Sequence, residues 1–186
     1  MLWLLLGCFL QKWSPVDSAY VETETYPVFE NCENTIQNYA CDFSAINEFS
    51  QETNLYDFYS RPIVLDLSAM WCPPCQAAAA EVEELAKLYE DEDLIYLTVL
   101  IENKQGLPPT EEDIKWWLEE WGIIEQPVLG SNRGLIDNND AEKGWLLQGW
   151  PTFYFIDEEM KIQGYMNGYS RNGVIDGINF ITEKSK

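Results

Sequence analysis

A short apolar segment, two closely spaced cysteines and an alanine-rich segment follow one another in this chain, and this order constrains the fold most. Residues 63–67 read IVLDL, a β-branched and apolar run that predicts a buried strand. The sequence WCPPC follows at residues 71–75. A helix is predicted over residues 76–89, because alanine is the strongest helix former and apolar residues recur there at helical spacing. The cysteine pair is therefore expected between a buried strand and a helix.

The two cysteines of this motif are placed for thiol chemistry. Proline is tolerated only in the first turn of a helix, so Pro73 and Pro74 predict that Cys72 lies at the helix start. The free N–H groups there favour a thiolate, which is the attacking species. Cys75 lies one turn later and can attack a mixed disulfide formed on Cys72. Because the two prolines remove N–H donors and the chain is acidic, we expect the pKa of Cys72 to be lowered moderately.

The composition excludes several classes of function. The chain has no histidine, which rules out a Ser-His-Asp triad, a Cys-His dyad and histidine-bearing zinc or copper sites. It also rules out haem attachment through C-x-x-C-H, since Gln76 follows Cys75. The 32 acidic and 11 basic residues give a net charge of -21, which repels phosphate backbones, so we expect no nucleic-acid partner. We also expect no metal and no dissociable cofactor, because the cysteine pair itself carries the electrons.

Two segments of the chain resemble the thioredoxin superfamily, and within it the TlpA-like or redoxin-type thiol-disulfide oxidoreductases. They read IVLDLSAMWCPPC at residues 63–75 and GWPTFYFID at residues 149–157, and the resemblance covers residues 60–169. It implies an α/β thioredoxin fold, with a central mixed β-sheet flanked by helices. It also implies a redoxin-type insertion before the strand that follows a cis-proline.

The resemblance further implies roles for individual residues. Cys72 would attack and Cys75 would resolve, while Asp66 would be the buried acid that exchanges a proton with the resolving cysteine. Pro151 matches the cis-proline opposite the dithiol. The residues expected to contact a partner chain are Trp71, Pro73, Pro74, Trp150, Pro151 and Thr152.

Three of these assignments keep a purely structural alternative. Asp66 could serve only as a hydrogen-bond partner of backbone at a strand end, and Trp71 could serve only in packing. Pro151 could be an ordinary trans proline, because cis is the minority state of X-Pro bonds in general.

The N-terminus reads MLWLLLGCFL, an apolar run too short to span a bilayer and about the size of a signal-peptide core. Residues 5–8 resemble the bacterial lipobox, whose cysteine carries lipid after cleavage, so Cys8 is the candidate lipid anchor. A buried N-terminal strand or helix is the alternative. We expect the protein to be exported, and to reside in the periplasm or another extracytoplasmic space as a membrane-anchored lipoprotein.

The domain organisation follows from this start and from the residues after it. We expect a signal or lipobox-like segment over residues 1–11 and an acidic, proline-punctuated tether over 12–40. The thioredoxin-like domain is expected over residues 41–186.

Cys32 and Cys41 form a second pair of cysteines near in sequence. A disulfide between them would close a loop of about ten residues and contribute about 2.5–3 kcal/mol of stability. It would fit an oxidising compartment. The alternative, two unpaired small apolar residues, stays open. A zinc site built from all four of these cysteines is discounted, because the spacing of the first pair is unusually wide.

The rest of the chain supplies further elements. Glu102 follows a predicted strand and is expected near the dithiol. The patterns predict a buried strand over residues 94–101, a helix between Thr110 and Gly122, a short strand at 127–129, a short helix over 141–148, a hairpin of 152–156 with 161–166, and a helix over 174–181 weakened by Gly173 and Gly177.

Together these patterns predict an exported thiol-disulfide oxidoreductase that acts on protein thiols or disulfides and exchanges electrons with a membrane-linked or soluble redox partner. Two other classes stay open. A peroxiredoxin-like peroxidase would share the fold, but it uses Thr or Ser three residues before the reactive cysteine, where this chain has Ala69. A non-enzymatic binding module, in which the motif forms only a structural disulfide, is the second.

Overall fold

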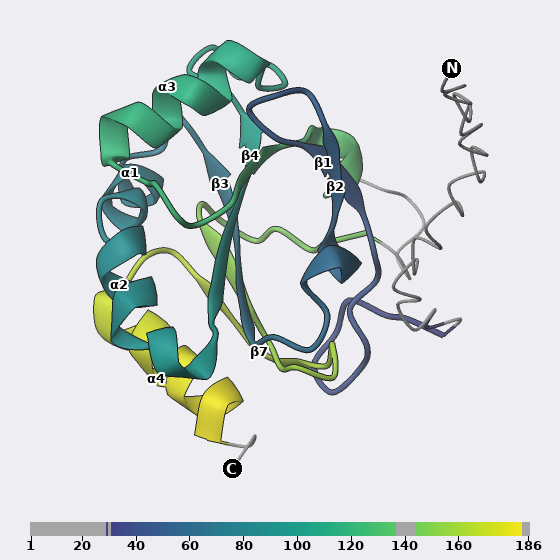
Figure 1. Cartoon of the computed structure of the whole chain (residues 1–186). Coiled ribbons are helices and arrows are strands. Elements are labelled where there is room, and N and C mark those ends of the chain that lie inside the picture. The colour runs from purple at the N-terminus through teal and green to yellow at the C-terminus, as the bar shows by residue number, and fades with distance from the viewer. Residues whose placement is uncertain (1–28, 30, 137–143, 184–186) are drawn as a thin grey trace, which may run out of the picture.

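The computed structural model describes residues 29, 31–136 and 144–183, and its strands form one mixed sheet in the order β2-β1-β5-β4-β3-β6-β7 (Figure 1). The strands are β1 (Ser44–Ile46), β2 (Glu52–Asn54), β3 (Ile63–Ala69), β4 (Ile95–Glu102), β5 (Val128–Gly130), β6 (Thr152–Ile156) and β7 (Ile162–Asn167). The helices are α1 (Pro73–Ala79), α2 (Val82–Leu88), α3 (Glu111–Trp121) and α4 (Arg171–Glu183), with 3-10 turns at Leu55–Phe58, Glu90–Glu92 and Arg133–Leu135. This is the α/β thioredoxin fold that the motif predicts.

The two long central strands are buried along their whole length, as their continuous apolar sequences predict. β3 pairs in parallel with β4 on one side and antiparallel with β6 on the other. β4 in turn pairs in parallel with β5. The carboxyl end of β3, which leads into the cysteine motif, therefore lies beside the first residues of β6.

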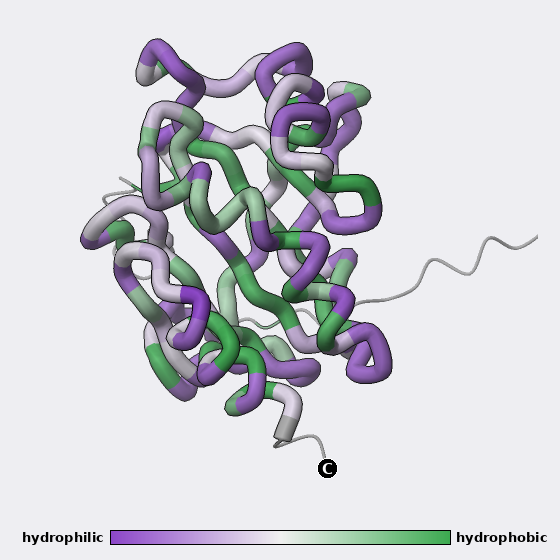
Figure 2. Tube along the Cα trace, turned by 90° about the vertical axis from the view of Figure 1, so that its left-hand side faces the viewer, coloured by the Kyte–Doolittle hydropathy of each residue, from purple (hydrophilic) through white to green (hydrophobic). Residues whose placement is uncertain are grey.

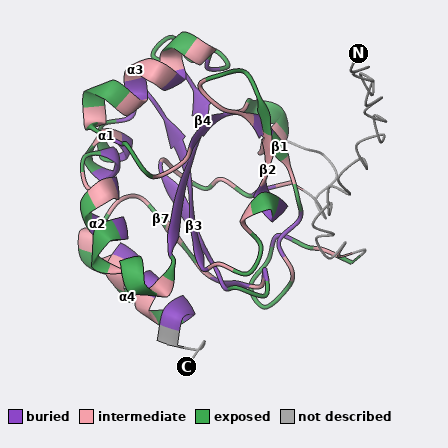
Figure 3. Cartoon of the chain, viewed as in Figure 1, coloured by how far each residue is buried: buried purple, intermediate pink, exposed green. Residues whose placement is uncertain are grey.

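Side chains alternate between the two faces of this sheet, and each face has its own core. We call the first the helix-side core, because α1, α2, α3 and α4 cover it (Figure 1); it includes Val64, Tyr96 and Phe153. The opposite core includes Leu65 and Tyr154 and is covered by the segment before β3 and by residues 135–136 and 144–147. Figure 3 shows the buried strands between these layers, and Figure 2 shows hydrophobic segments through the interior with hydrophilic residues on the outer turns.

The helix after the cysteine motif is interrupted, so the prediction of one helix over residues 76–89 is wrong. α1 ends at Ala79, and α2 begins at Val82. Between them the Glu81 N–H donates to the Ala78 carbonyl, a tighter bond than the α-helical one. The Glu81 side chain pairs with Arg171 from α4. The break turns Glu81 toward α4, a tertiary contact that alanine propensity does not report.

Several other elements match the sequence patterns. α3 begins at a capping box formed by Thr110 and Asp113 and ends at Gly122, whose positive φ of 65° suits glycine. The predicted hairpin and the C-terminal helix are present as β6, β7 and α4. In α4, Gly177 lies against the ring of Phe155, where a Cβ atom would overlap the ring.

The short helix predicted over residues 141–148 is not found. Residues 141–143 lie outside the described residues, and 144–148 are not helical. Instead, the fully buried Trp145 packs edge-on against Phe43 and Tyr154, which holds this stretch as an irregular cover on the opposite core. Among the described residues, no helix combines the length and apolar character that crossing a bilayer requires.

A disulfide joins Cys32 to Cys41, with their Cα atoms 4.9 Å apart, which is one of the two alternatives that the sequence leaves open. The Asn34 side chain accepts a hydrogen bond from the Cys41 N–H at 2.8 Å, and Tyr39 forms a β-bridge with Lys161 beside β7. The last residues of the stretch expected to act as a tether thus pack against the sheet edge.

We predict that replacing both Cys32 and Cys41 with serine lowers the free energy of unfolding by about 2.5–3 kcal/mol, because the unfolded chain regains the entropy of the loop. Urea denaturation followed by tryptophan fluorescence would measure the loss. Cys32→Ser alone should lose about as much, since either change opens the loop. Equal stability of the double variant and the unmodified protein would contradict a structural role for this disulfide.

Candidate active site

Cys72 and Cys75 form a disulfide at the start of α1, with their Cα atoms 5.3 Å apart. Cys72 is the N-cap of the helix, with extended backbone, and Pro73 and Pro74 occupy its first turn as predicted. Since neither proline has an N–H, the first donor that reaches the Cys72 sulfur is the Cys75 N–H, at 3.2 Å. The helix end therefore offers this sulfur one backbone hydrogen bond.

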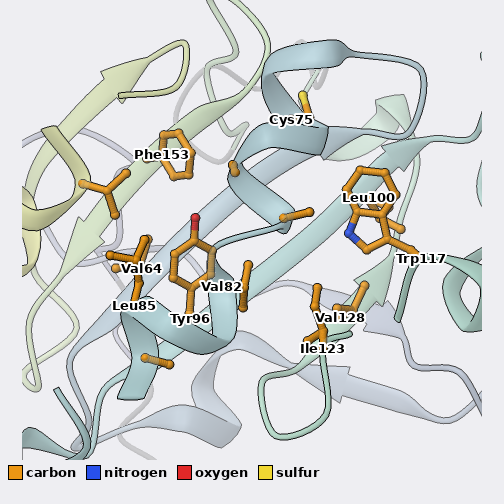
Figure 4. Packing of buried hydrophobic residues seen from close by; sticks show 14 of the residues in the cluster. Val64, Cys75, Val82, Leu85, Tyr96, Leu100, Trp117, Ile123, Val128 and Phe153 are labelled. Carbon is orange, nitrogen blue, oxygen red and sulfur yellow. The ribbon is translucent and has the colours of Figure 1, made fainter. Parts of the chain in front are cut away.

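The two sulfurs differ in their surroundings. Cys75 is fully buried and belongs to the helix-side core, at whose edge Figure 4 shows its side chain. Cys72 retains 2% exposure and lies between Trp71 and Pro73, which are exposed. In this disulfide form, Cys72 is thus the sulfur nearer to a partner, and Cys75 is the inner one.

A hydrogen-bonded group holds Trp71 beside the cysteines. Its indole N–H donates to one carboxylate oxygen of Glu102 at 2.7 Å. The other oxygen of Glu102 accepts from Arg133 at 2.5 Å, and Glu102 itself is buried. Glu102 is the last residue of β4, so the expectation that it lies by the motif is met. Arg133 was missed, because the only signal it carries is a basic residue within the insertion.

The loop before β6 brings a second tryptophan to the motif. The rings of Trp71 and Trp150 meet edge to face, with centroids 5.9 Å apart. The peptide bond between Trp150 and Pro151 is cis, which confirms that expectation. Thr152 begins β6 opposite Leu67 of β3, which places the loop next to the chain that leads into the cysteines.

Pro151 and Thr152 are both buried, unlike the other residues expected to contact a partner. The Thr152 hydroxyl lies 2.8 Å from the Gly149 carbonyl oxygen and 2.9 Å from the Asn167 side-chain oxygen, and it can donate its one proton to either. The side chain is therefore used within the protein to hold the loop of residues 149–151. By contrast, Trp71, Pro73 and Pro74 are exposed around Cys72.

Asp66 lies in the middle of β3 and is 1% exposed. Side chains alternate between the two faces along a strand, so Asp66 points to the same helix-side face as Val64, two residues earlier. One carboxylate oxygen accepts a hydrogen bond from the Ser68 hydroxyl at 2.6 Å, whereas the other has no partner among the described residues. Burial raises the pKa of Asp66 to about 7, and the Ser68 hydrogen bond opposes this shift. A carboxyl group of this kind can both give and take a proton near neutral pH.

The comparisons with known proteins agree with this fold. The family model of the AhpC/TSA family matches residues 36–165. The thioredoxin-like protein YneN of Bacillus subtilis is 25% identical over 146 residues, which cover 77% of this chain and 79% of that protein.

Solved structures give the same result. A thiol:disulfide interchange protein of the thioredoxin family from Chlorobium tepidum superposes with a TM-score of 0.63 at 17% identity, covering 80% of this chain and 98% of that one. The exposed lipoprotein thioredoxin Etrx1 of Streptococcus pneumoniae gives 0.58 at 24% identity, covering 75% and 99%. Because the family model spans well over half of the sequence, this chain belongs to the AhpC/TSA family, within the thioredoxin superfamily.

Proposed function

We propose that this protein is a thiol-disulfide oxidoreductase that exchanges its dithiol for a disulfide in partner proteins. The observation that carries the proposal is the Cys72–Cys75 disulfide at the start of α1, beside the loop with the cis bond to Pro151. The names of YneN and of the Chlorobium tepidum protein support the same chemistry for relatives.

The reaction needs only the two sulfurs and a proton acceptor. In the reduced protein the Cys72 thiolate attacks a partner disulfide, forms a mixed disulfide and displaces one partner sulfur, which takes up a proton. Cys75 then loses its proton and attacks the Cys72 sulfur. This step closes the Cys72–Cys75 disulfide and releases the second partner thiol. Two electrons have passed to the partner, and the reverse sequence oxidises it.

The local geometry suits Cys72 to the attacking role. The Cys75 N–H bond to its sulfur favours the thiolate over the thiol. With Pro73 and Pro74 supplying no further donors, a moderate lowering of the pKa of Cys72 follows, which increases the thiolate fraction at neutral pH.

Asp66 is the proposed proton acceptor for Cys75. Both residues lie in the helix-side layer, and no ionised basic group is among the causes that shift the pKa of Asp66. With its pKa raised to about 7 by burial, Asp66 can take the Cys75 proton and later return it.

A partner chain would dock around Cys72 through exposed and loop residues. We assign this surface to Trp71, Pro73, Pro74, Trp150 and Pro151, with Thr152 holding the loop from inside. The docking group is mostly apolar and rigid, which suits an extended segment of a protein rather than a small molecule.

Export and anchoring complete the proposal. Residues 1–28, with the signal-like segment and Cys8, lie outside the described residues. The Cys32–Cys41 disulfide supports an oxidising, extracytoplasmic compartment. In that compartment a membrane-linked or soluble redox partner would restore the dithiol, and a lipid on Cys8 would hold the protein at the membrane.

Trapping tests the proposed function. In a Cys75→Ser variant the mixed disulfide on Cys72 has no resolving thiol, so we expect disulfide-linked adducts with partner proteins or with a disulfide-containing peptide. The adducts should disappear on reduction and be missing in Cys72→Ser. Absence of any adduct, with the unmodified protein also unable to reduce insulin, would refute the proposal. Consumption of peroxide without insulin reduction would favour the peroxidase instead, although Ala69 lies where that chemistry uses a hydroxyl.

A further inference from the structure

Several oxygen-bearing side chains lie together in the helix-side core, behind the cysteine pair. Asp66 on β3 is paired in register with Thr98 on β4, and Val64 is paired with Tyr96. The side chains of Asp66, Tyr96 and Thr98 therefore project from neighbouring positions of the same face. All three are buried.

These groups are left with unused hydrogen-bonding capacity. The second oxygen of Asp66 and the hydroxyls of Tyr96 and Thr98 have no hydrogen-bond partner among the described residues. An unpaired buried hydroxyl costs about 1–3 kcal/mol, and phenylalanine would fill the Tyr96 position without that cost. Buried polar atoms without protein partners are as a rule bridged by ordered water. The Tyr96 hydroxyl therefore needs a reason other than packing.

A second tyrosine, Tyr169, lies near Tyr96. Figure 4 shows the Tyr96 oxygen pointing to the side of the Phe153 ring. Phe153 also packs near Tyr169, with the two ring centroids 6.3 Å apart. Tyr169 follows β7, and its hydroxyl, like that of Tyr96, is buried without a hydrogen-bond partner among the described residues. It lies close enough to Glu81 to be the main cause that lowers the pKa of that carboxyl group. The Glu81 side chain is 31% exposed and pairs with Arg171.

The electrostatics of these groups also show that they influence one another. Burial raises the pKa of Tyr96 well above its usual value, and the charges of Asp66, Tyr169 and Glu81 raise it further. Burial and the nearby Glu81 carboxyl group likewise raise the pKa of Tyr169. Tyr96 thus lies within electrostatic reach of the buried Asp66 and of both Tyr169 and Glu81. Both tyrosines stay protonated, so they can pass a proton without forming a lasting anion.

We propose that Tyr96 and Tyr169 form a proton route between solvent at Glu81 and the buried Asp66. This tyrosine route rests on the proposed function, because it serves the proton that Asp66 exchanges with Cys75. A proton enters at Glu81. The hydroxyls of Tyr169 and Tyr96 then each accept one proton while releasing their own, and water molecules connect groups that are not in direct contact. Asp66 gains one proton and the hydroxyls end unchanged. The reverse sequence returns the proton to solvent.

The test follows Asp66 itself and needs no substrate. The oxidised, full-length protein is subjected to a rapid pH jump from about pH 9 to about pH 5, across the pKa of Asp66. Time-resolved infrared spectroscopy then records the carboxylic-acid C=O stretch, and Asp66→Asn identifies the band of Asp66. We expect protonation of Asp66 to be about tenfold slower or more in Tyr96→Phe and in Tyr169→Phe. The protonated fraction of Asp66 at equilibrium should change little in both variants. A variant that only disturbed the surroundings of Asp66 would also shift this fraction.

Tyr56→Phe is the matched control. The Tyr56 hydroxyl is buried in the opposite core and donates to the Ala40 carbonyl at 2.7 Å, so its removal should leave the rate unchanged. Tyr96→Phe should still fold, because the Tyr96 hydroxyl has no hydrogen-bond partner among the described residues.

Unchanged rates in both route variants would overturn the proposal and show that protons reach Asp66 from the side of the cysteines. Slowing in Tyr96→Phe alone would overturn the role of Tyr169. Since the measurement involves no partner, its failure leaves the trapping experiment unaffected. A failure of trapping would refute the oxidoreductase function and not the proton path.

Discussion

Replacing Cys72 with serine is expected to abolish the reduction of protein disulfides, by a factor on the order of 10³ or more. Serine keeps the size of the side chain, but its hydroxyl does not ionise near neutral pH and cannot form a mixed disulfide. The remaining Cys75 cannot take over, because it is fully buried in the helix-side core. Insulin reduction with a regenerating thiol reductant measures the loss.

The double variant Cys32→Ser/Cys41→Ser provides the control for this prediction. It also removes a disulfide, but one that lies beside β7 and not at α1, so its activity should remain close to that of the unmodified protein under conditions where it is folded. Alkylation provides a second check, since the thiol left in Cys72→Ser should react far more slowly than the thiol left in Cys75→Ser. Substantial insulin reduction by Cys72→Ser would contradict the assignment of the attacking cysteine.

Replacing Asp66 with asparagine is expected to change how stability depends on pH. Burial raises the pKa of Asp66 to about 7 in the folded protein, against a usual value of 3.8. Between these values the folded state binds more protons than the unfolded state, so stability falls as pH rises from about 4 to about 7. Above about pH 7 the full penalty of a buried charge is present, on the order of 4 kcal/mol.

Asparagine carries no charge, so it removes this penalty at high pH. At low pH it has no such effect, because Asp66 is then already uncharged. The stability of Asp66→Asn relative to the unmodified protein should therefore improve by about 4 kcal/mol between about pH 4 and about pH 8.5. The buried amide of asparagine costs the same free energy at every pH, so it shifts the whole stability curve without changing its dependence on pH. Urea denaturation across this range measures the difference. Glu158→Gln, at an exposed position, is the control, because solvent screens that charge. Parallel pH curves for Asp66→Asn and the unmodified protein would contradict a buried carboxyl with a raised pKa.

Local sequence signals suffice for much of the fold and for the centre of the site. The apolar run of β3, the two prolines at the start of α1 and the capping box of α3 each restrict a few neighbouring residues to one conformation. β1 and β2 were not predicted, because three-residue strands with sequences SAI and ETN carry no clear alternation. The break between α1 and α2 was also missed, since Ala80 and its neighbours are strong helix formers.

By itself the amino-acid sequence determines where the dithiol lies and which cysteine begins the helix. It also excludes nucleic-acid binding and histidine-based chemistry. These points depend only on residue identity, net charge and short-range spacing. Only the tertiary structure brings Arg133 to Glu102, turns Glu81 toward Arg171 and places Tyr96 near Asp66. Each of these pairings joins residues far apart in the chain. They depend on how strands align and helices cross the sheet, which no local pattern records.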